Sequence, residues 1–165
     1  MESFDVVVIG SGPGGYVCAI RSSQLGMKVA IIEKYNSLGG TCLNVGCIPS
    51  KSLLESSELY HKANTEFSEH GIKATPKLDF PKMVSRKSKV VKENSEGLNF
   101  LMKKNKISVF HGLGKLTKTG DVEILSDDGK KILKAKNVVI ATGSKPIIPS
   151  FIDFDKKRII SSTEA

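Results

Sequence analysis

Apolar runs and a glycine-rich turn alternate over the first 34 residues. "FDVVVIG" (residues 4–10) and "MKVAIIEK" (residues 27–34) are continuous apolar runs rich in β-branched residues. Such runs are typical of strands buried on both faces, as in a parallel sheet. Between them, "GSGPGGYVCAIRSSQLG" (residues 10–26) has apolar residues on one helical side and ends at a glycine. The pattern therefore predicts a strand, a glycine-rich turn, a helix and a second strand, which together form a βαβ unit.

Helical periodicity returns in two later segments. Pro49 suits the first turn of a helix that continues through residues 50–63. Residues 80–105 have apolar positions three, four and seven apart, which predicts a long amphipathic helix. The apolar face of this second helix comprises Met83, Val84, Val90, Val91, Leu98 and Leu101.

The last third of the chain has short apolar runs separated by turn residues. "TGD" (residues 119–121) and "DDGK" (residues 127–130) interrupt these runs, and "NVVIA" (residues 137–141) closes the series. This arrangement predicts strands joined by hairpin turns. The fold expected for the whole chain is α/β: a Rossmann-like domain with a parallel sheet, long helices and a small antiparallel β-meander.

Composition is typical of one globular domain. The chain has 165 residues, of which 39% are hydrophobic and 25% are charged, enough for one hydrophobic core. No apolar run approaches the roughly 20 residues that a membrane span needs, and the N-terminus has no secretion signal. We therefore expect a cytoplasmic protein with no membrane partner, in a compartment that keeps thiols reduced.

The positive charge has an ordinary explanation. The net charge is +8, and the lysines concentrate in residues 81–93 and 101–107 without interleaved aromatic residues. Basic runs of this kind usually lie on solvated helix faces. We therefore expect no nucleic acid as a partner.

The predicted βαβ unit contains a dinucleotide-binding pattern. Gly10, Gly12 and Gly15 form G-x-G-x-x-G, and Glu33 stands at the end of the second strand, 18 residues beyond Gly15. The glycines permit a tight turn, a close approach of the backbone to a pyrophosphate and close packing of the helix on the strand. The helix N-terminus attracts phosphate, and the acid accepts hydrogen bonds from a ribose. The pattern predicts dinucleotide binding but does not choose between NAD and FAD.

Two of the three cysteines lie close together in "GGTCLNVGCIPSK" (residues 39–51). In a regular helix Cys42 and Cys47 would be about 140° apart around the axis, so a bridge between them requires an irregular turn. Gly46 and Pro49 permit such a turn. The helix that follows places Cys47 beside a helix N-terminus, where the thiolate is favoured, and Lys51 adds positive charge.

The spacing of the two cysteines leaves three interpretations open. A zinc site needs about four ligands, and His61, His70 and His111 are scattered singly. Two packed, unbridged thiols are also compatible with the spacing, and Cys18 in the first helix fits that role. A disulfide in a reducing compartment would be catalytic rather than structural.

Three segments together resemble the flavoprotein disulfide reductases: "VVVIGSGPGGYVCAI", "GGTCLNVGCIPSK" and "VVIATGSKP". The wording around the cysteines is most similar to the dihydrolipoyl dehydrogenase branch of this family, and the likeness runs from residue 4 to the end. Glutathione and mercuric reductases are similar at the cysteine pair but typically have Val where this chain has Leu43 and Ile48.

The resemblance implies a role for each matching residue. Cys42 and Cys47 would form the catalytic redox disulfide, with Cys47 nearer the flavin and Cys42 exchanging with the substrate dithiol. The residues that would contact FAD are Gly10, Gly12, Gly14, Gly15, Glu33, Lys34, Gly40, Thr41, Cys42, Lys51, Gly114, Thr142, Gly143 and Ser144.

The resemblance also implies an activity for a longer protein. Such enzymes oxidise dihydrolipoamide on the lipoyl domains of 2-oxo-acid dehydrogenase complexes with FAD and NAD+, as homodimers. This chain has no second G-x-G-x-x-G and no segment like the family's catalytic histidine. We therefore expect an incomplete FAD domain (residues 1–146), a linker (residues 147–165) and no turnover by the chain alone. A non-catalytic FAD-binding piece is the alternative.

Overall fold

The two apolar runs near the N-terminus form neighbouring parallel strands, as predicted. The computed structural model describes residues 2–165, in which β1 (Glu2–Ile9) and β2 (Val29–Glu33) flank the helix α1 (Pro13–Gln24). Val6 of β1 is in register with Val29 of β2. Every residue of β2 is buried, as expected for a strand covered on both faces.

The six strands form one mixed sheet in the order β3-β2-β1-β6-β5-β4. β3 (Ser108–His111) is parallel to β2, and β4 (Leu113–Leu116) and β5 (Val122–Ser126) form an antiparallel hairpin. The long strand β6 (Gly129–Ile140) pairs with β5 in its first half and with β1 in its second half. The predicted hairpins and last strand are therefore confirmed, and β6 joins the meander to the parallel strands.

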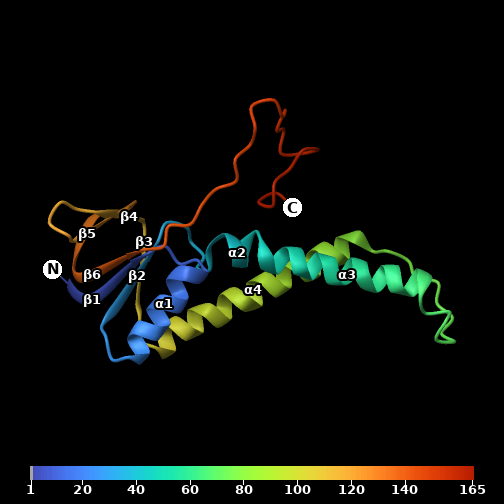
Figure 1. Ribbon diagram of the computed structural model, residues 1–165, viewed down its shortest axis with the longest axis horizontal. Coiled ribbons are helices and arrows are strands. Elements are labelled where there is room, and N and C mark those ends of the chain that lie inside the picture. Colours follow the sequence, from blue (N-terminus) through green and yellow to red (C-terminus); the bar gives the residue numbers. More distant parts are fainter. Residues whose placement is uncertain (1) are drawn as a thin grey trace.

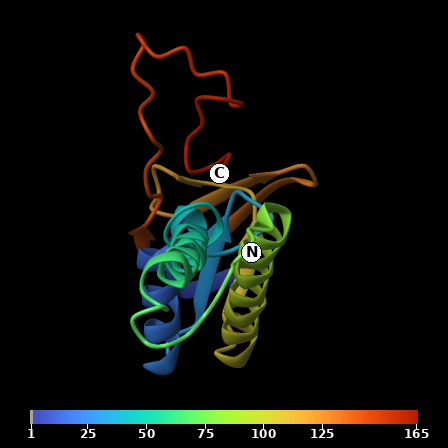
Figure 2. The ribbon, with the colours of Figure 1, turned by 90° about the vertical axis from the view of Figure 1, so that its right-hand side faces the viewer.

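The parallel strands have a hydrophobic core on each face. On one face Val8 and Ile31 pack with helix residues such as Met102. On the other face Val7 and Ile32 pack with Val122 and other residues of the meander. The molecule therefore has three layers, with the meander and the helices on opposite faces of the parallel strands (Figures 1 and 2).

Two long helices cover one face and extend beyond it. The short helix α2 (Gly40–Asn44) leads into α3 (Cys47–Thr65), and α4 (Phe80–Lys104) lies beside α3 (Figure 1). Both predicted long helices are confirmed. α3 begins earlier than predicted, because Cys47 and Ile48 already belong to its first turn, with Pro49 third.

The buried face of α4 differs from the prediction at its C-terminal end. Leu101 is 39% exposed, whereas Met102 is 1% exposed and packs in the core between the helices and the sheet. Positions four and seven apart lie on one side of a helix, so Val91, Leu98 and Met102 form the stripe that contacts the sheet. The prediction that Leu101, three residues after Leu98, belongs to the buried face was therefore wrong.

Residues 141–165 follow β6 without helix or strand and extend away from the sheet (Figure 1). Ile147 and Phe151 in this segment are 90% and 87% exposed. The predicted domain (residues 1–146) and linker (residues 147–165) stay a prediction. Across residues 2–165, none of the helices combines the length and apolar character needed to cross a membrane.

Candidate functional site

The glycine-rich turn passes tightly between the ends of β1 and β6. Gly10 has a left-handed φ of +101°, and a Cβ atom there would collide with the carbonyl oxygen of Ala141. A Cβ atom on Gly15 would collide with the carbonyl of Gly10. Both positions therefore require glycine, because the backbone leaves no room for a side chain.

The turn opens toward solvent at the first turn of α1. An added Cβ atom on Gly14 would meet nothing within 4 Å. In the described part of the chain, no side chain caps the helix at Gly12, and its first turn has no acidic residue. The free N–H groups and the positive end of the helix dipole thus face open space, an arrangement that fits a pyrophosphate.

Glu33 lies at the same edge of the sheet and is 5% exposed. Its Oε2 accepts hydrogen bonds from the Ser11 backbone N–H at 3.0 Å and from the Ser11 hydroxyl at 2.6 Å. Its Oε1 accepts one from the Tyr35 N–H at 3.0 Å. A carboxylate has about four acceptor sites, so Oε1 keeps the capacity to accept a ribose hydroxyl.

Ser11, which was not predicted as a site residue, also contacts the segment that leads to the cysteines. The Gly39 N–H donates to the Ser11 carbonyl at 3.0 Å and to its hydroxyl at 3.1 Å. One residue on, a Cβ atom on Gly40 would lie 2.7 Å from the Gly12 Cα. In the sequence, the only sign of this contact between the glycine-rich turn and residues 39–40 was a hydroxyl residue between the first two glycines.

The helix that would carry both cysteines is broken between them. α2 ends at Asn44, and α3 begins at Cys47 with Gly46 as its N-cap. The irregular turn expected between the cysteines is therefore present. It leaves Cys42 and Cys47 as free thiols that lie close enough for Cys47 to shift the pKa of Cys42.

The two thiols have different environments. The hydrogen bond with Cys47, followed by burial and the charge of Cys47, raises the pKa of the Cys42 thiol above its ordinary value. The Cys47 backbone N–H and the charge of Lys51 oppose this increase in pKa. Cys47 is exposed and Cys42 is only partly exposed. The disulfide itself stays a prediction, because the structure shows the dithiol.

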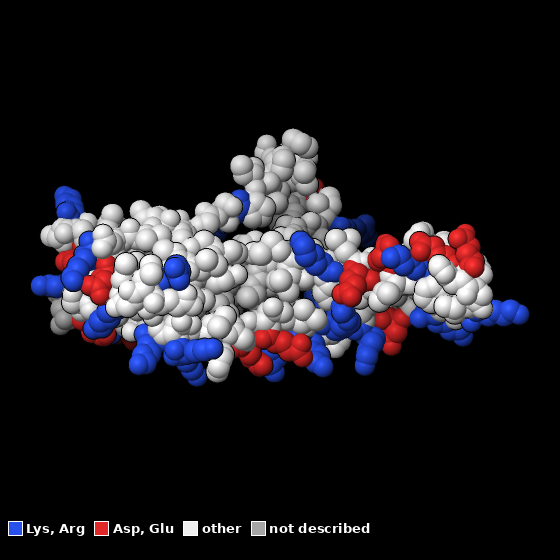
Figure 3. Space-filling view, turned by 60° about the horizontal axis from the view of Figure 1, so that its bottom comes forward, with Lys and Arg blue, Asp and Glu red and all other residues white. Residues whose placement is uncertain are grey.

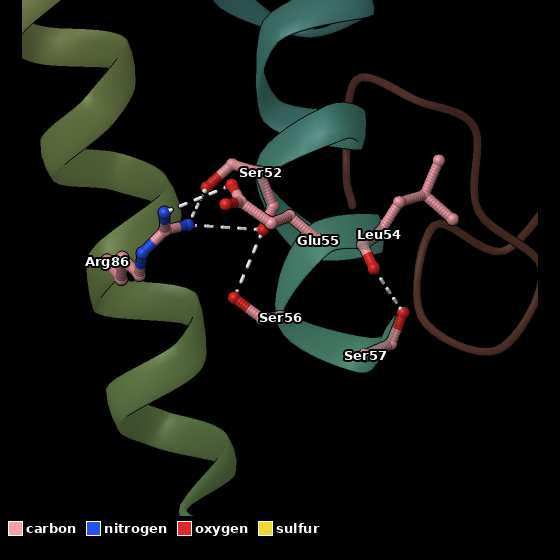
Figure 4. Close-up of polar contacts among 6 residues, drawn as sticks. All are labelled: Ser52, Leu54, Glu55, Ser56, Ser57 and Arg86. Atoms are coloured by element: carbon pink, nitrogen blue, oxygen red, sulfur yellow. Dashed lines mark hydrogen bonds and ion pairs between the residues drawn. The ribbon is translucent and has the colours of Figure 1, made fainter. Parts of the chain in front are cut away.

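Polar contacts anchor α3 to α4 near the cysteine pair (Figure 4). The Arg86 guanidinium of α4 donates to the hydroxyl of Ser52 at 2.9 Å and to its carbonyl oxygen at 3.3 Å. Arg86 also pairs with Glu55 at 3.3 Å. Ser52 is 6% exposed and lies five residues after Cys47, so this contact fixes the second turn of the helix that carries Cys47.

The other predicted site residues lie in several elements of the fold. Gly114 of β4 lies over the ends of β1 and β2, where an added Cβ atom would be 2.9 Å from Ile9 Cγ2. Gly143 has a left-handed φ of +69° just after β6, between the exposed residues Thr142 and Ser144. Three more exposed residues complete the set: Lys34, which stacks on Tyr35 at 4.9 Å, Thr41 and Lys51.

The remaining cysteine and histidines have the ordinary surroundings that were expected. Cys18 is partly buried and packs against the helix-side core. His111 contacts the Tyr35 carbonyl oxygen through Nδ1 at 2.9 Å. Over residues 2–165, no three His, Cys, Asp or Glu residues group together as a metal site would require.

The basic residues lie among acidic ones. Lysine and arginine alternate with aspartate and glutamate over the face shown in Figure 3. On α4, Lys89 pairs with Glu93 at 3.7 Å and Lys92 with Glu96 at 3.9 Å, all largely exposed. This arrangement agrees with the predicted solvated helix face.

Known proteins are similar to this chain over nearly its whole length. Residues 4–165 match the family described as pyridine nucleotide-disulphide oxidoreductase. The chain is 49% identical to dihydrolipoyl dehydrogenase 1, mitochondrial, from Arabidopsis thaliana over 98% of its length, and 47% identical to dihydrolipoyl dehydrogenase 3 from Pseudomonas putida over all of it. It is also 48% identical to the leghemoglobin reductase of Vigna unguiculata over 98% of its length.

A solved structure gives the same result for the fold. The Cu(II) complex of the HOCl-induced flavoprotein disulfide reductase RclA from Escherichia coli superposes with a TM-score of 0.76 at 25% identity, over 91% of this chain and 31% of that one. The chain spans about a third of the length of the curated relatives it matches, at 32%, 36% and 31% of the three named above. The family and its flavoprotein neighbours imply FAD as the cofactor. By its sequence match and its fold, the chain belongs to the pyridine nucleotide-disulphide oxidoreductase family.

Proposed function

We propose that this chain provides the redox-active cysteine pair and most of the FAD contacts of a dihydrolipoyl dehydrogenase. The observation that carries the proposal is the contact between the Cys42 and Cys47 thiols at a helix break. The segment that leads into this break is hydrogen-bonded to the dinucleotide-binding turn. A pair of thiols is thereby adjacent to a site for an electron-accepting cofactor.

The glycine turn would hold the pyrophosphate of FAD, through the backbone of Gly12, Gly14 and Gly15. The remaining acceptor capacity of Glu33 would bind the adenosine ribose, and the backbone near Gly114 would meet the adenine. Bound FAD supplies a two-electron acceptor for the reduced cysteine pair. Gly40, Thr41, Cys42 and Lys51 would lie on the flavin side. The other residues that would contact the cofactor are Lys34, next to Glu33, and Thr142, Gly143 and Ser144, which follow β6.

The cysteine pair would oxidise a dithiol by two exchange steps. First, one substrate thiolate attacks the Cys42 sulfur of the oxidised pair, which forms a mixed disulfide and releases Cys47 as a thiolate. Second, the other substrate thiolate attacks the substrate sulfur of the mixed disulfide, which closes the substrate disulfide and releases Cys42. Two electrons pass from the substrate to the pair, and the two substrate protons pass to the released thiolates or to solvent.

Dihydrolipoamide is the dithiol we propose, on the lipoyl domains of 2-oxo-acid dehydrogenase complexes. The support is the similarity to proteins named dihydrolipoyl dehydrogenase. NAD+ as the final acceptor, the homodimer and the catalytic histidine would belong to the whole enzyme. Several relatives are named as mitochondrial and others are bacterial, so the cytoplasmic location stays a prediction.

Peptide mapping under non-reducing conditions tests the proposal. After oxidation with oxidised glutathione, we expect a Cys42–Cys47 link and a free Cys18. Addition of dihydrolipoamide should open this link. A link that involves Cys18, or three free thiols after oxidation, would contradict the proposed function.

A further inference from the structure

The Ser11 hydroxyl is hydrogen-bonded to both halves of the proposed site, the dinucleotide turn with Glu33 and the segment that leads to the cysteines. It donates to Glu33 Oε2 at 2.6 Å and accepts from the Gly39 N–H at 3.1 Å. Ser11 has no exposed surface, and Glu33 is 5% exposed. Because water does not reach this hydroxyl, its two partners fix its orientation.

The Gly39 end of this contact controls where α2 begins. Gly39 is the N-cap of α2, and its φ of +101° is left-handed. A Cβ atom on Gly39 would lie 2.6 Å from Leu43 Cβ, so Leu43 packs closely against this residue. The close packing of Leu43 and the two hydrogen bonds to Ser11 restrict the position of the Gly39 amide. Cys42 follows three residues later.

The Glu33 end is equally constrained. Both the backbone N–H and the hydroxyl of Ser11 donate to the same oxygen, Oε2. A rotation of the carboxylate toward a new donor therefore pulls on the Ser11 side chain. Through the second bond of the hydroxyl, that movement reaches the Gly39 amide.

We propose that Ser11 is a positioning residue that couples the orientation of the Glu33 carboxylate to the spacing of the Cys42 and Cys47 thiols. This inference rests on the proposed function of the cysteine pair. Hydrogen bonds that share a hydroxyl polarise and orient one another. The dinucleotide end of the site thus influences the dithiol end through one buried side chain.

The test compares disulfide formation in four forms of the 165-residue chain: wild type, Ser11→Ala, Glu33→Gln and the double variant. Each reaction converts two thiols and one oxidised glutathione into the Cys42–Cys47 disulfide and two reduced glutathione molecules. Quenching with acid, alkylation and mass spectrometry give the equilibrium constant. Ser11→Ala removes only the hydroxyl and leaves both backbone hydrogen bonds of residue 11 in place.

Ser23→Ala is the matched control. The Ser23 hydroxyl is partly buried and donates to the Asn105 carbonyl, which joins the C-terminal ends of α1 and α4. We expect Ser11→Ala to lower the equilibrium constant about fivefold, the equivalent of one neutral hydrogen bond, and Ser23→Ala to leave it unchanged. Glu33→Gln should lower the constant in the wild-type background and have no further effect in Ser11→Ala.

Two results would overturn the inference. One is a shift for Ser11→Ala no larger than that for Ser23→Ala, and the other is an effect of Glu33→Gln that is equal in both backgrounds. If the wild type forms no Cys42–Cys47 disulfide, the proposed function is wrong, and hydrogen exchange decides the inference separately. Exchange at the amides of residues 39–42 should be faster in Ser11→Ala than in wild type or Ser23→Ala, and equal rates would sink the idea.

Discussion

Cys42 and Cys47 differ in solvent exposure, in the opposite order from what their proposed roles suggest at first. The resemblance assigns contact with the substrate to Cys42, yet Cys47 is the more exposed thiol in the chain without FAD. A flavin beside Cys47 would cover that thiol and leave Cys42 as the accessible partner. The exposure of Cys47 is therefore compatible with its proposed place next to the cofactor.

Alkylation should distinguish the two thiols. We expect iodoacetamide to modify Cys47 faster than Cys42 at neutral pH, because Cys42 is less exposed and its pKa is raised by the hydrogen bond with Cys47 and by burial. A raised pKa means less thiolate at a given pH, so the Cys42 rate should keep increasing at pH values where an ordinary cysteine has levelled off. Peptide-resolved mass spectrometry against pH measures both rates.

The control for this experiment is Cys47→Ala. It removes the largest cause of the raised pKa, so the pH profile of Cys42 should move toward that of an ordinary thiol. An unchanged profile would show that the pKa of Cys42 does not depend on its neighbour.

Glu33 permits a second prediction at this scale. Glu33→Ala should weaken FAD binding by about 1.5–3 kcal/mol, the typical contribution of hydrogen bonds to a charged group. Equilibrium dialysis of FAD against the two forms measures the difference. Glu58→Ala, which removes an exposed acid paired with Lys62 on α3, should have no effect, and equal FAD binding by all three forms would mean that Glu33 only ends a strand.

At the scale of elements, the packing of α4 decides which of its apolar residues stabilise the fold. Met102→Ala should lower the free energy of unfolding by about 2–5 kcal/mol, because the side chain fills the core between the helices and the sheet. Leu101→Ala should change it by less than about 0.5 kcal/mol, since Leu101 is 39% exposed. Urea denaturation of both variants measures the difference. Equal decreases in the free energy of unfolding would mean that Met102 is not more important than Leu101 for packing α4 on the sheet.

Local pattern was enough to predict most elements of this fold. The strands β1 and β2, the turn between them and the long helices each have a periodicity or a glycine signal within their own residues. The choice between Leu101 and Met102 depends instead on how α4 crosses the sheet, which no local pattern contains. Ser11 contacts Glu33 and Gly39, which lie 22 and 28 positions away in the sequence. Local pattern could not predict these contacts either.

The pairing of β6 with both β5 and β1 could not be predicted from the sequence either. A run of 12 residues that pairs with β5 and then with β1 depends on two different partners. The sequence predicted the last strand only as residues 137–141, because lysines interrupt its first half. Two of those lysines pair with acids on neighbouring strands: Lys130 with Glu123 of β5, and Lys131 with Glu2 of β1 at 2.8 Å.

For the whole molecule, the site lies at one edge of the sheet and part of it faces solvent. The chain spans about a third of its curated relatives, and residues beyond β6 expose large apolar side chains such as Ile147 and Phe151. Catalysis by thiol exchange requires a base that removes the proton from the substrate thiol. Neither a base of this kind nor a nicotinamide site was recognised in the 165 residues.

We therefore expect no NADH formation from dihydrolipoamide and NAD+ by this chain, at any FAD concentration. A known dihydrolipoyl dehydrogenase assayed in parallel is the positive control. Absorbance of NADH under steady-state conditions is the measurement. Sustained NADH production by the purified chain would reveal a base and a nicotinamide site that were not recognised.

The pairing of β1 with both β2 and β6 has a consequence for folding during translation. β1 meets β2 after about 20 intervening residues, but Ile9 must wait for Ile140 on its other side. Until residue 140 emerges, the apolar strand β1 has an open edge, and such edges recruit other chains. Closing so long a loop is also slow. The docking of β6 onto β1 should therefore be the late step of folding, and the period before it is when a chaperone would be most useful.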